Sequence, residues 1–125
     1  MNVVDSSGWL EYFTDGTNIN FFSPAIEDPD ELVVPSISIY EVFKRILQQR
    51  SEHDALQAAA AMMSGKIADL DQTLAMNAAR ISTDLRLPMA DSIILATARK
   101  YDAVLWTQDD DFKSIKGVRY VQKIA

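Results

Sequence analysis

Cysteine is absent from this 125-residue sequence, and histidine occurs only once, as His53. The lack of cysteine excludes disulfides, thiolate metal sites and cysteine nucleophiles, and it fits a reducing compartment. A single histidine in a polar helix start argues against most zinc sites and against a Ser-His-Asp triad. No apolar run approaches ~18 residues, and the N-terminus lacks the features of a secretory signal. We therefore expect a cytoplasmic protein without a membrane span.

Positive charge is missing from the first third of the chain. Residues 1–43 carry eight acids and no Lys or Arg, whereas half of the twelve basic residues lie after position 98. The net charge of -6 argues against a simple basic nucleic-acid binder. The uneven distribution predicts a polarised surface.

Short apolar runs alternate with segments of helical periodicity along the whole sequence. Such alternation is typical of βαβ units and a parallel sheet covered on both faces. We predict an α/β three-layer sandwich with a central, mostly parallel five-stranded sheet, formed by residues 1–125 as one domain, with the first strand in its middle. The predicted strands are 2–4, 32–34, 66–70, 103–107 and 119–121. The predicted helices are 8–13, 18–26, 52–64 and 74–85, with two more that begin at Ser38 and near Ala90.

Local signals predict how two of these helices begin and end. Ser38 and Glu41 have the spacing of a capping box, which would start a helix at Ser38. Gly65 has the position of a C′ residue that ends the helix before it. The buried stripe of the helix from Ser38 is predicted to consist of Ile39, Phe43, Ile46 and Leu47.

Four acids fall where a predicted strand has just ended or a helix has just begun. They are Asp5, Glu41, Asp91 and Asp109. Each has an ordinary structural explanation as a helix cap or as a carboxylate favoured by a helix dipole. Strand ends and the following helix starts share one edge of a parallel sheet, so together the four would converge in one cleft. Such a cluster is costly unless a cation neutralises it, and oxygen ligands without Cys or His favour Mg²⁺ or Mn²⁺.

Four segments carry a resemblance to a known family. They are Asp5-Ser6-Ser7, Glu41 at the head of its helix, the run from Asp91 to Ala98, and Thr107-Gln108-Asp109-Asp110-Asp111-Phe112. In this order and spacing the sequence resembles the PIN-domain ribonucleases, and more narrowly the VapC-type toxins of type II toxin–antitoxin pairs. The most specific piece is the Thr-x-Asp-x-Asp-Phe run directly after an apolar strand.

The resemblance implies an activity and a set of site residues. The family's acidic quartet corresponds to Asp5, Glu41, Asp91 and Asp109, with Asp111 as a possible further metal ligand and with Ser7 and Thr107 at its hydroxyl positions. The implied activity is Mg²⁺- or Mn²⁺-dependent hydrolysis of single-stranded or loop RNA. The implied partners are a VapB-type antitoxin and a second copy of the chain in a homodimer.

Two further sets of residues are candidates for contacts with these partners. Lys44, Arg45, Arg99 and Lys100 are the cations we expect to contact RNA phosphates. Phe21, Phe22, Met62 and Met63 exceed what one narrow helical stripe can bury, so they are candidates for an interface or, equally, for the core.

Other classes remain to be weighed against this interpretation. A receiver-type signalling domain would need adjacent acids after the first strand, where Ser6 follows Asp5 instead. Haloacid-dehalogenase-type phosphatases need Asp-x-Asp at the first strand, where Ser7 occupies the second position. A catalytically inactive PIN-like binding module is the remaining alternative, and a metal-dependent cleavage assay separates it from a nuclease.

Overall fold

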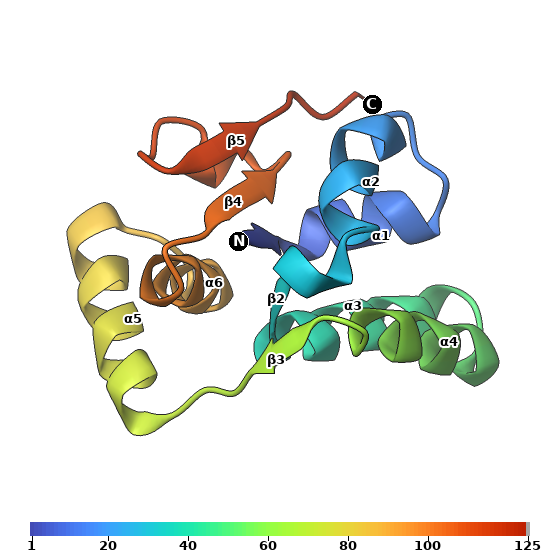
Figure 1. Cartoon of the computed structure of the whole chain (residues 1–125), viewed down its shortest axis with the longest axis horizontal. Coiled ribbons are helices and arrows are strands. Elements are labelled where there is room, and N and C mark those ends of the chain that lie inside the picture. Colours follow the sequence, from blue (N-terminus) through green and yellow to red (C-terminus); the bar gives the residue numbers. More distant parts are fainter. Residues whose placement is uncertain (125) are drawn as a thin grey trace.

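The computed structural model describes residues 1–124, in which strands and helices alternate as the sequence predicts (Figure 1). The strands are β1 (Asn2–Val4), β2 (Val33–Pro35), β3 (Lys66–Ala68), β4 (Val104–Thr107) and β5 (Val118–Tyr120). The helices are α1 (Ser6–Phe13), α2 (Ile19–Ile26), α3 (Ser36–Gln49), α4 (Glu52–Met62), α5 (Gln72–Leu85) and α6 (Met89–Lys100). Two short 3₁₀ turns, η1 (Pro29–Glu31) and η2 (Asp110–Phe112), complete the order.

All strand pairings are parallel, but the five strands do not form one sheet. β1, β4 and β5 form a three-stranded sheet in the order β1-β4-β5, and β2 pairs with β3 separately. A single parallel bridge between Asn2 and Leu32 links the two sheets. The prediction of one five-stranded sheet is therefore wrong in this detail, and β1 lies at the edge of its sheet, next to the junction. Three-residue strands offer so few pairing positions that one missing bridge is enough to divide a sheet.

Helices cover both faces of the sheets, which is the layered arrangement that the sequence predicts. Neighbouring valines of one strand enter opposite halves of the core: Val4 packs with Trp9 and Phe22, whereas Val3 packs with Leu95 and Leu105. This division follows from the period-2 alternation of side chains along a strand. Helices α1 to α4 enclose the first half of the core, and α6 encloses the second.

Helix α3 begins two residues earlier than predicted, and the expected capping box is absent. Pro35 takes the N-cap position without a side-chain hydrogen bond, so Ser38 lies inside the helix, fully buried. The buried stripe also differs from the prediction, because α3 packs with Ser38, Val42 and Ile46 toward the core. Val42 is buried in it, whereas Leu47 is 45% exposed. Pro can occupy the residue before a helix because its fixed φ suits that position and it needs no amide partner.

Gly65 is required for close packing rather than for a helix C-cap. Helix α4 ends at Met62, and Gly65 does not have the positive φ of a C′ glycine. A Cβ at Gly65 would lie 3.0 Å from the carbonyl oxygen of Leu32. Glycine therefore lets the chain entering β3 approach β2 closely.

Within residues 1–124, every helix is too short or too polar to cross a lipid bilayer.

Candidate active site

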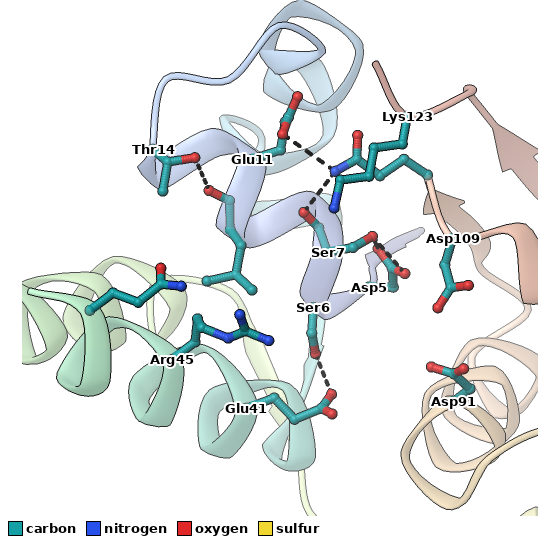
Figure 2. A pocket seen from close by; sticks show the side chains of 13 residues that line it. Asp5, Ser6, Ser7, Glu11, Thr14, Glu41, Arg45, Asp91, Asp109 and Lys123 are labelled. Atoms are coloured by element: carbon teal, nitrogen blue, oxygen red, sulfur yellow. Dashed lines mark hydrogen bonds between the residues drawn. The ribbon is translucent and has the colours of Figure 1, made fainter. Parts of the chain in front are cut away.

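Four predicted acids, Asp5, Glu41, Asp91 and Asp109, line one cavity of about 440 Å³. They come from four different elements: the end of β1, helix α3, the first turn of α6, and the segment after β4. Figure 2 shows Glu41 and Asp91 on opposite walls of this cavity, with their carboxylates turned toward one another. The structure thus brings together residues that lie up to about 100 positions apart in the sequence. We call this hollow the acidic cavity.

Asp5 lies at the bottom of the site and is almost fully engaged in hydrogen bonds. Its carboxylate accepts from the Gly8 amide at 3.0 Å, from the Ser7 hydroxyl at 2.8 Å and from the Thr107 hydroxyl at 2.7 Å. Only 2% of Asp5 is exposed. Burial raises its pKa to about 6, and these hydrogen bonds hold the pKa below the value that burial alone would produce. Asp5 thus caps α1 and ties it to β4.

Thr107 connects two acids of the site. Its hydroxyl donates to Asp5 and also accepts from the backbone amide of Asp109 at 2.9 Å. Because it is fully buried on the last residue of β4, it fixes the orientation of Asp5 relative to the loop that carries Asp109. The predicted hydroxyl positions, Ser7 and Thr107, therefore both hold Asp5.

Asp91 is the acid whose charge is most disfavoured. Burial is the largest cause, followed by the nearby carboxylates of Asp109, Asp5, Asp111 and Glu41, and together they raise its pKa to about 7. Carboxylates that share a site cannot all ionise without a compensating positive charge. The crowding predicted from strand ends is thus present around Asp91.

The tightest carboxylate group consists of Asp91, Asp109 and Asp111. One oxygen from each of these residues lies within 4.8 Å of the other two. Asp5 and Glu41 are outside this group: Asp5 accepts the hydrogen bonds given above, and Glu41 accepts from the Ser6 hydroxyl at 2.6 Å. Oxygen-only donors at this spacing fit a hard divalent cation such as Mg²⁺ or Mn²⁺. The acidic cluster could therefore bind a metal ion.

The four cations predicted to contact RNA fall into two places. Arg45 lines the acidic cavity, and Lys44 lines a smaller hollow beside it. Arg99 and Lys100 lie at the other end of α6 from Asp91, about 12 Å along the helix axis, and line a different hollow. Lys100 also forms an ion pair with Asp71 at 3.6 Å. The structure therefore places Lys44 and Arg45, but neither Arg99 nor Lys100, beside the acids.

Sequence reasoning missed a polar network on the α1 side of the cavity. Glu11 accepts from the backbone amide of Asn18 at 2.7 Å. The side-chain amide of Asn18 donates to the Gln108 side chain at 2.9 Å and to the backbone carbonyl of Gln122 at 3.0 Å. These contacts anchor the C-terminal segment, from which Lys123 also lines the cavity (Figure 2). Glu11 could have been found, because it lies four positions after Ser7 on α1, on the same face of the helix. Nothing in the local sequence indicates the partners of Asn18.

The excess apolar residues divide between core and surface. Phe22 and Met62 are fully buried in the core, and Phe21 packs edge-on against Trp106. Met63 is 57% exposed. The core interpretation thus holds for Phe22 and Met62, whereas Met63 stays a candidate interface residue.

The fold is shared with several solved structures. A toxin–antitoxin complex from Klebsiella pneumoniae superimposes with a TM-score of 0.80 at 22% identity, covering 95% of this chain and 96% of that one. The sarcin-ricin loop cleaving toxin VapC20 of Mycobacterium tuberculosis superimposes with a TM-score of 0.78 at 15% identity, covering 93% and 95%. DNA-bound VapBC from Salmonella typhimurium superimposes with a TM-score of 0.75 at 16% identity, covering 98% of both chains.

Sequence comparison identifies the family. Among curated proteins no sequence matches this chain. The profile of the PIN domain, however, matches residues 3–118, which include β2, β3 and β4, parts of β1 and β5, and every acid of the cavity. The chain therefore belongs to the PIN domain family.

Proposed function

We propose that this protein is a metal-dependent endoribonuclease that acts as the toxin of a type II toxin–antitoxin pair. The observation that carries the nuclease proposal is the convergence of Asp91, Asp109 and Asp111, with Asp5 and Glu41 around the same cavity. Membership of the PIN domain family supports the same activity.

The residues of the cavity have distinct roles in this proposal. Asp91, Asp109 and Asp111 would hold Mg²⁺ or Mn²⁺, with Glu41 and Asp5 completing the negative charge around the site. Such an ion supplies Lewis-acid stabilisation of phosphate charge and makes a water molecule more acidic. Thr107 and Ser7 keep Asp5 oriented, and Arg45 and Lys123 attract the phosphates. Hydrolysis then breaks the bond between phosphorus and the 3′ oxygen, leaving 5′-phosphate and 3′-hydroxyl ends.

Cleavage of single-stranded RNA by the purified chain tests the nuclease proposal. We expect cleavage with Mg²⁺ or Mn²⁺ and none with EDTA, together with a loss of about 100-fold in Asp91→Asn and Asp109→Asn, since groups that support a metal site contribute losses of this order. The rates are measured with a labelled oligonucleotide, and the product ends are checked by their sensitivity to a 5′-phosphate-dependent exonuclease.

Asp110→Asn is the matched control for these variants. Asp110 lies between Asp109 and Asp111 in sequence, but it is outside the tight carboxylate group and accepts a hydrogen bond from Tyr120. Its variant should cleave at the wild-type rate. If Asp91→Asn and Asp109→Asn also cleave at that rate, the site assignment is wrong. RNA binding without any metal-dependent cleavage would instead indicate an inactive PIN-like binding module.

The toxin role is supported by similarity of fold over nearly the whole length of this chain and of the toxin–antitoxin structures. We expect a VapB-type antitoxin as partner and a homodimer of this chain. Exposed apolar side chains such as Met63, Met76 and Met89 are available for these interfaces. Adaptable interfaces favour methionine because its side chain is unbranched and flexible.

Expression in bacteria tests the toxin role separately from the chemistry. Growth should stop when the chain is produced alone and resume when the neighbouring open reading frame is co-expressed, and the two proteins should co-purify. Asp91→Asn, which keeps the outer surface, should lose toxicity and still co-purify with the partner. A wild-type chain that is harmless alone and binds no neighbour-encoded protein would contradict the toxin role but not the nuclease.

A further inference from the structure

A second hollow, of about 290 Å³, adjoins the acidic cavity along helix α3. Its lining includes Tyr40, Lys44 and Gln48. It shares Ser6, Leu10, Glu41 and Arg45 with the acidic cavity, so the two hollows form one continuous depression. We call the part formed by Tyr40, Lys44 and Arg45 the α3 shelf.

Tyr40 is exposed in a way that packing of this chain does not require. The residue is 60% exposed, and it directly precedes Glu41 of the acidic cavity on the helix. The Lys44 ammonium lies 5.6 Å from the centre of its ring, which is within the range of a cation–π contact. An aromatic ring with a cation beside it is a surface on which a nucleic-acid base can stack.

The geometry of α3 places the shelf and the acids side by side. Residues four positions apart lie on the same face of a helix, so Tyr40 and Lys44 form one row and Glu41 and Arg45 form the next. Figure 2 shows Arg45 and Glu41 both directed into the acidic cavity. Among residues 1–124, neither Lys44 nor Arg45 forms an ion pair. Their positive charges are thus available to a polyanion whose next phosphate reaches the acids.

We infer that the α3 shelf binds one unpaired nucleotide of single-stranded RNA, adjacent to the phosphate that is cleaved. The base stacks on Tyr40, and Lys44 and Arg45 contact the phosphates on its two sides. This inference rests on the proposed nuclease function and adds a path for the substrate across an otherwise acidic surface. An acidic peptide would also meet the two cations, but its Asp and Glu side chains carry no aromatic ring to stack on Tyr40.

Binding of RNA to variants that cannot cleave it tests the shelf. All variants are made in an Asp91→Asn background, and the probe is a short fluorescein-labelled oligouridine whose affinity is measured by fluorescence anisotropy. Tyr40→Ala should weaken binding about 5- to 100-fold, the usual effect of losing one base–aromatic stack, whereas Tyr40→Phe should bind as the parent does. Lys44→Met should reduce the salt dependence of binding, with a log–log slope smaller by about 0.7, the value for one single-strand phosphate contact.

Lys100→Met is the matched control, because Lys100 lies 5.7 Å from the ring of Tyr101 in a similar pair at the far end of α6. It should leave the affinity and the salt slope unchanged. Double-stranded RNA should bind Tyr40→Ala and the parent equally well, since its bases cannot stack on the shelf. Thermal unfolding of each variant confirms that the exposed substitutions leave the fold intact.

Three results would overturn the inference: an oligouridine affinity unchanged in Tyr40→Ala, an equal loss of affinity for double-stranded RNA, or Tyr40-dependent binding of oligoglutamate in place of RNA. The outcome is separable from the nuclease proposal. If Tyr40→Ala weakens oligouridine binding but the wild-type chain cleaves no RNA with Mg²⁺ or Mn²⁺, the shelf is supported and the nuclease proposal is refuted. If the wild-type chain cleaves RNA with metal but Tyr40→Ala leaves the affinity unchanged, the nuclease proposal is supported and the shelf is refuted.

Discussion

Aspartates of the acidic cavity differ in what surrounds each carboxylate. Asp5 is surrounded by hydrogen-bond donors, which favour its charged form despite its burial. Asp91 is next to other carboxylates, and burial and repulsion both raise its pKa, to about 7. The metal-free site therefore has its least stable charge at Asp91, which is also the carboxylate that a cation would stabilise most.

Without metal, the protein should become less stable as pH rises from acid to neutral. The pKa of Asp91 is about 7 in the folded state against an ordinary value of 3.8, so between these values the folded chain holds a proton that the unfolded chain has lost. Stability then falls as pH rises through this window, because the native state binds more protons. Thermal unfolding in EDTA should give a lower Tm at about pH 8 than at about pH 5.

Asp91→Asn should reduce this dependence, because it removes one of the two protons that the folded state retains, the other being on Asp5, whose pKa is raised to about 6. Asp110→Asn should keep the wild-type slope, since Asp110 is outside the tight carboxylate group. Added Mg²⁺ or Mn²⁺ should raise the Tm most at the higher pH, where the carboxylates are free to bind it. A wild-type Tm that rises from pH 5 to pH 8 in EDTA would contradict the assigned protonation of Asp91.

At the scale of single elements, α3 shows how a two-residue difference in a helix start alters the roles of the side chains in its first turns. A start at Ser38 would make Ser38 a cap and would engage Glu41 in the same box. With the start at Ser36, Ser38 is inside the helix and buried, its hydroxyl has no hydrogen-bond partner within residues 1–124, and Glu41 accepts from Ser6 instead. Glu41 is thereby released from a capping role and joins the cavity.

Two serine substitutions should show whether Ser38 acts as a helix cap or as a buried residue inside α3, with Ser51 as the reference for a cap. Ser38→Ala should leave the free energy of unfolding unchanged or raise it, because it removes a buried hydroxyl that lacks a partner. Ser51→Ala should lower it by about 1 kcal/mol, since Ser51 caps α4 by accepting from the Asp54 amide at 3.1 Å. Chemical denaturation measures both. A loss at Ser38 as large as the loss at Ser51 would indicate that Ser38 does act as a cap.

At the scale of the whole molecule, the site lies where the two sheets and their helices meet. Asp5 follows the C-terminal end of β1, whereas the single bridge that links the sheets is at Asn2, at the other end of this strand. Glu41 comes from the helix after β2, and Asp109 comes from the segment after β4. The Asn18 side chain then joins α2 to Gln108 and to the C-terminal segment. Several long-range contacts thus hold the cavity together.

The sequence by itself determined the alternation of strands and helices, the family resemblance and the identity of the converging acids. These features depend on local periodicity and on the rule that parallel strands end at one edge of a sheet. They required no knowledge of side-chain partners.

Only the tertiary structure decided which acids lie within metal-binding distance of one another and which cations accompany them. The Asp5–Thr107 hydrogen bond joins residues 102 positions apart, and Asp5 lies outside the group formed by Asp91, Asp109 and Asp111. The division of the strands into two sheets likewise depends on one pairing between β1 and β2. Such contacts depend on register and on helix rotation, where each residue of shift turns a side chain by about 100°, and local sequence patterns do not specify either to that accuracy.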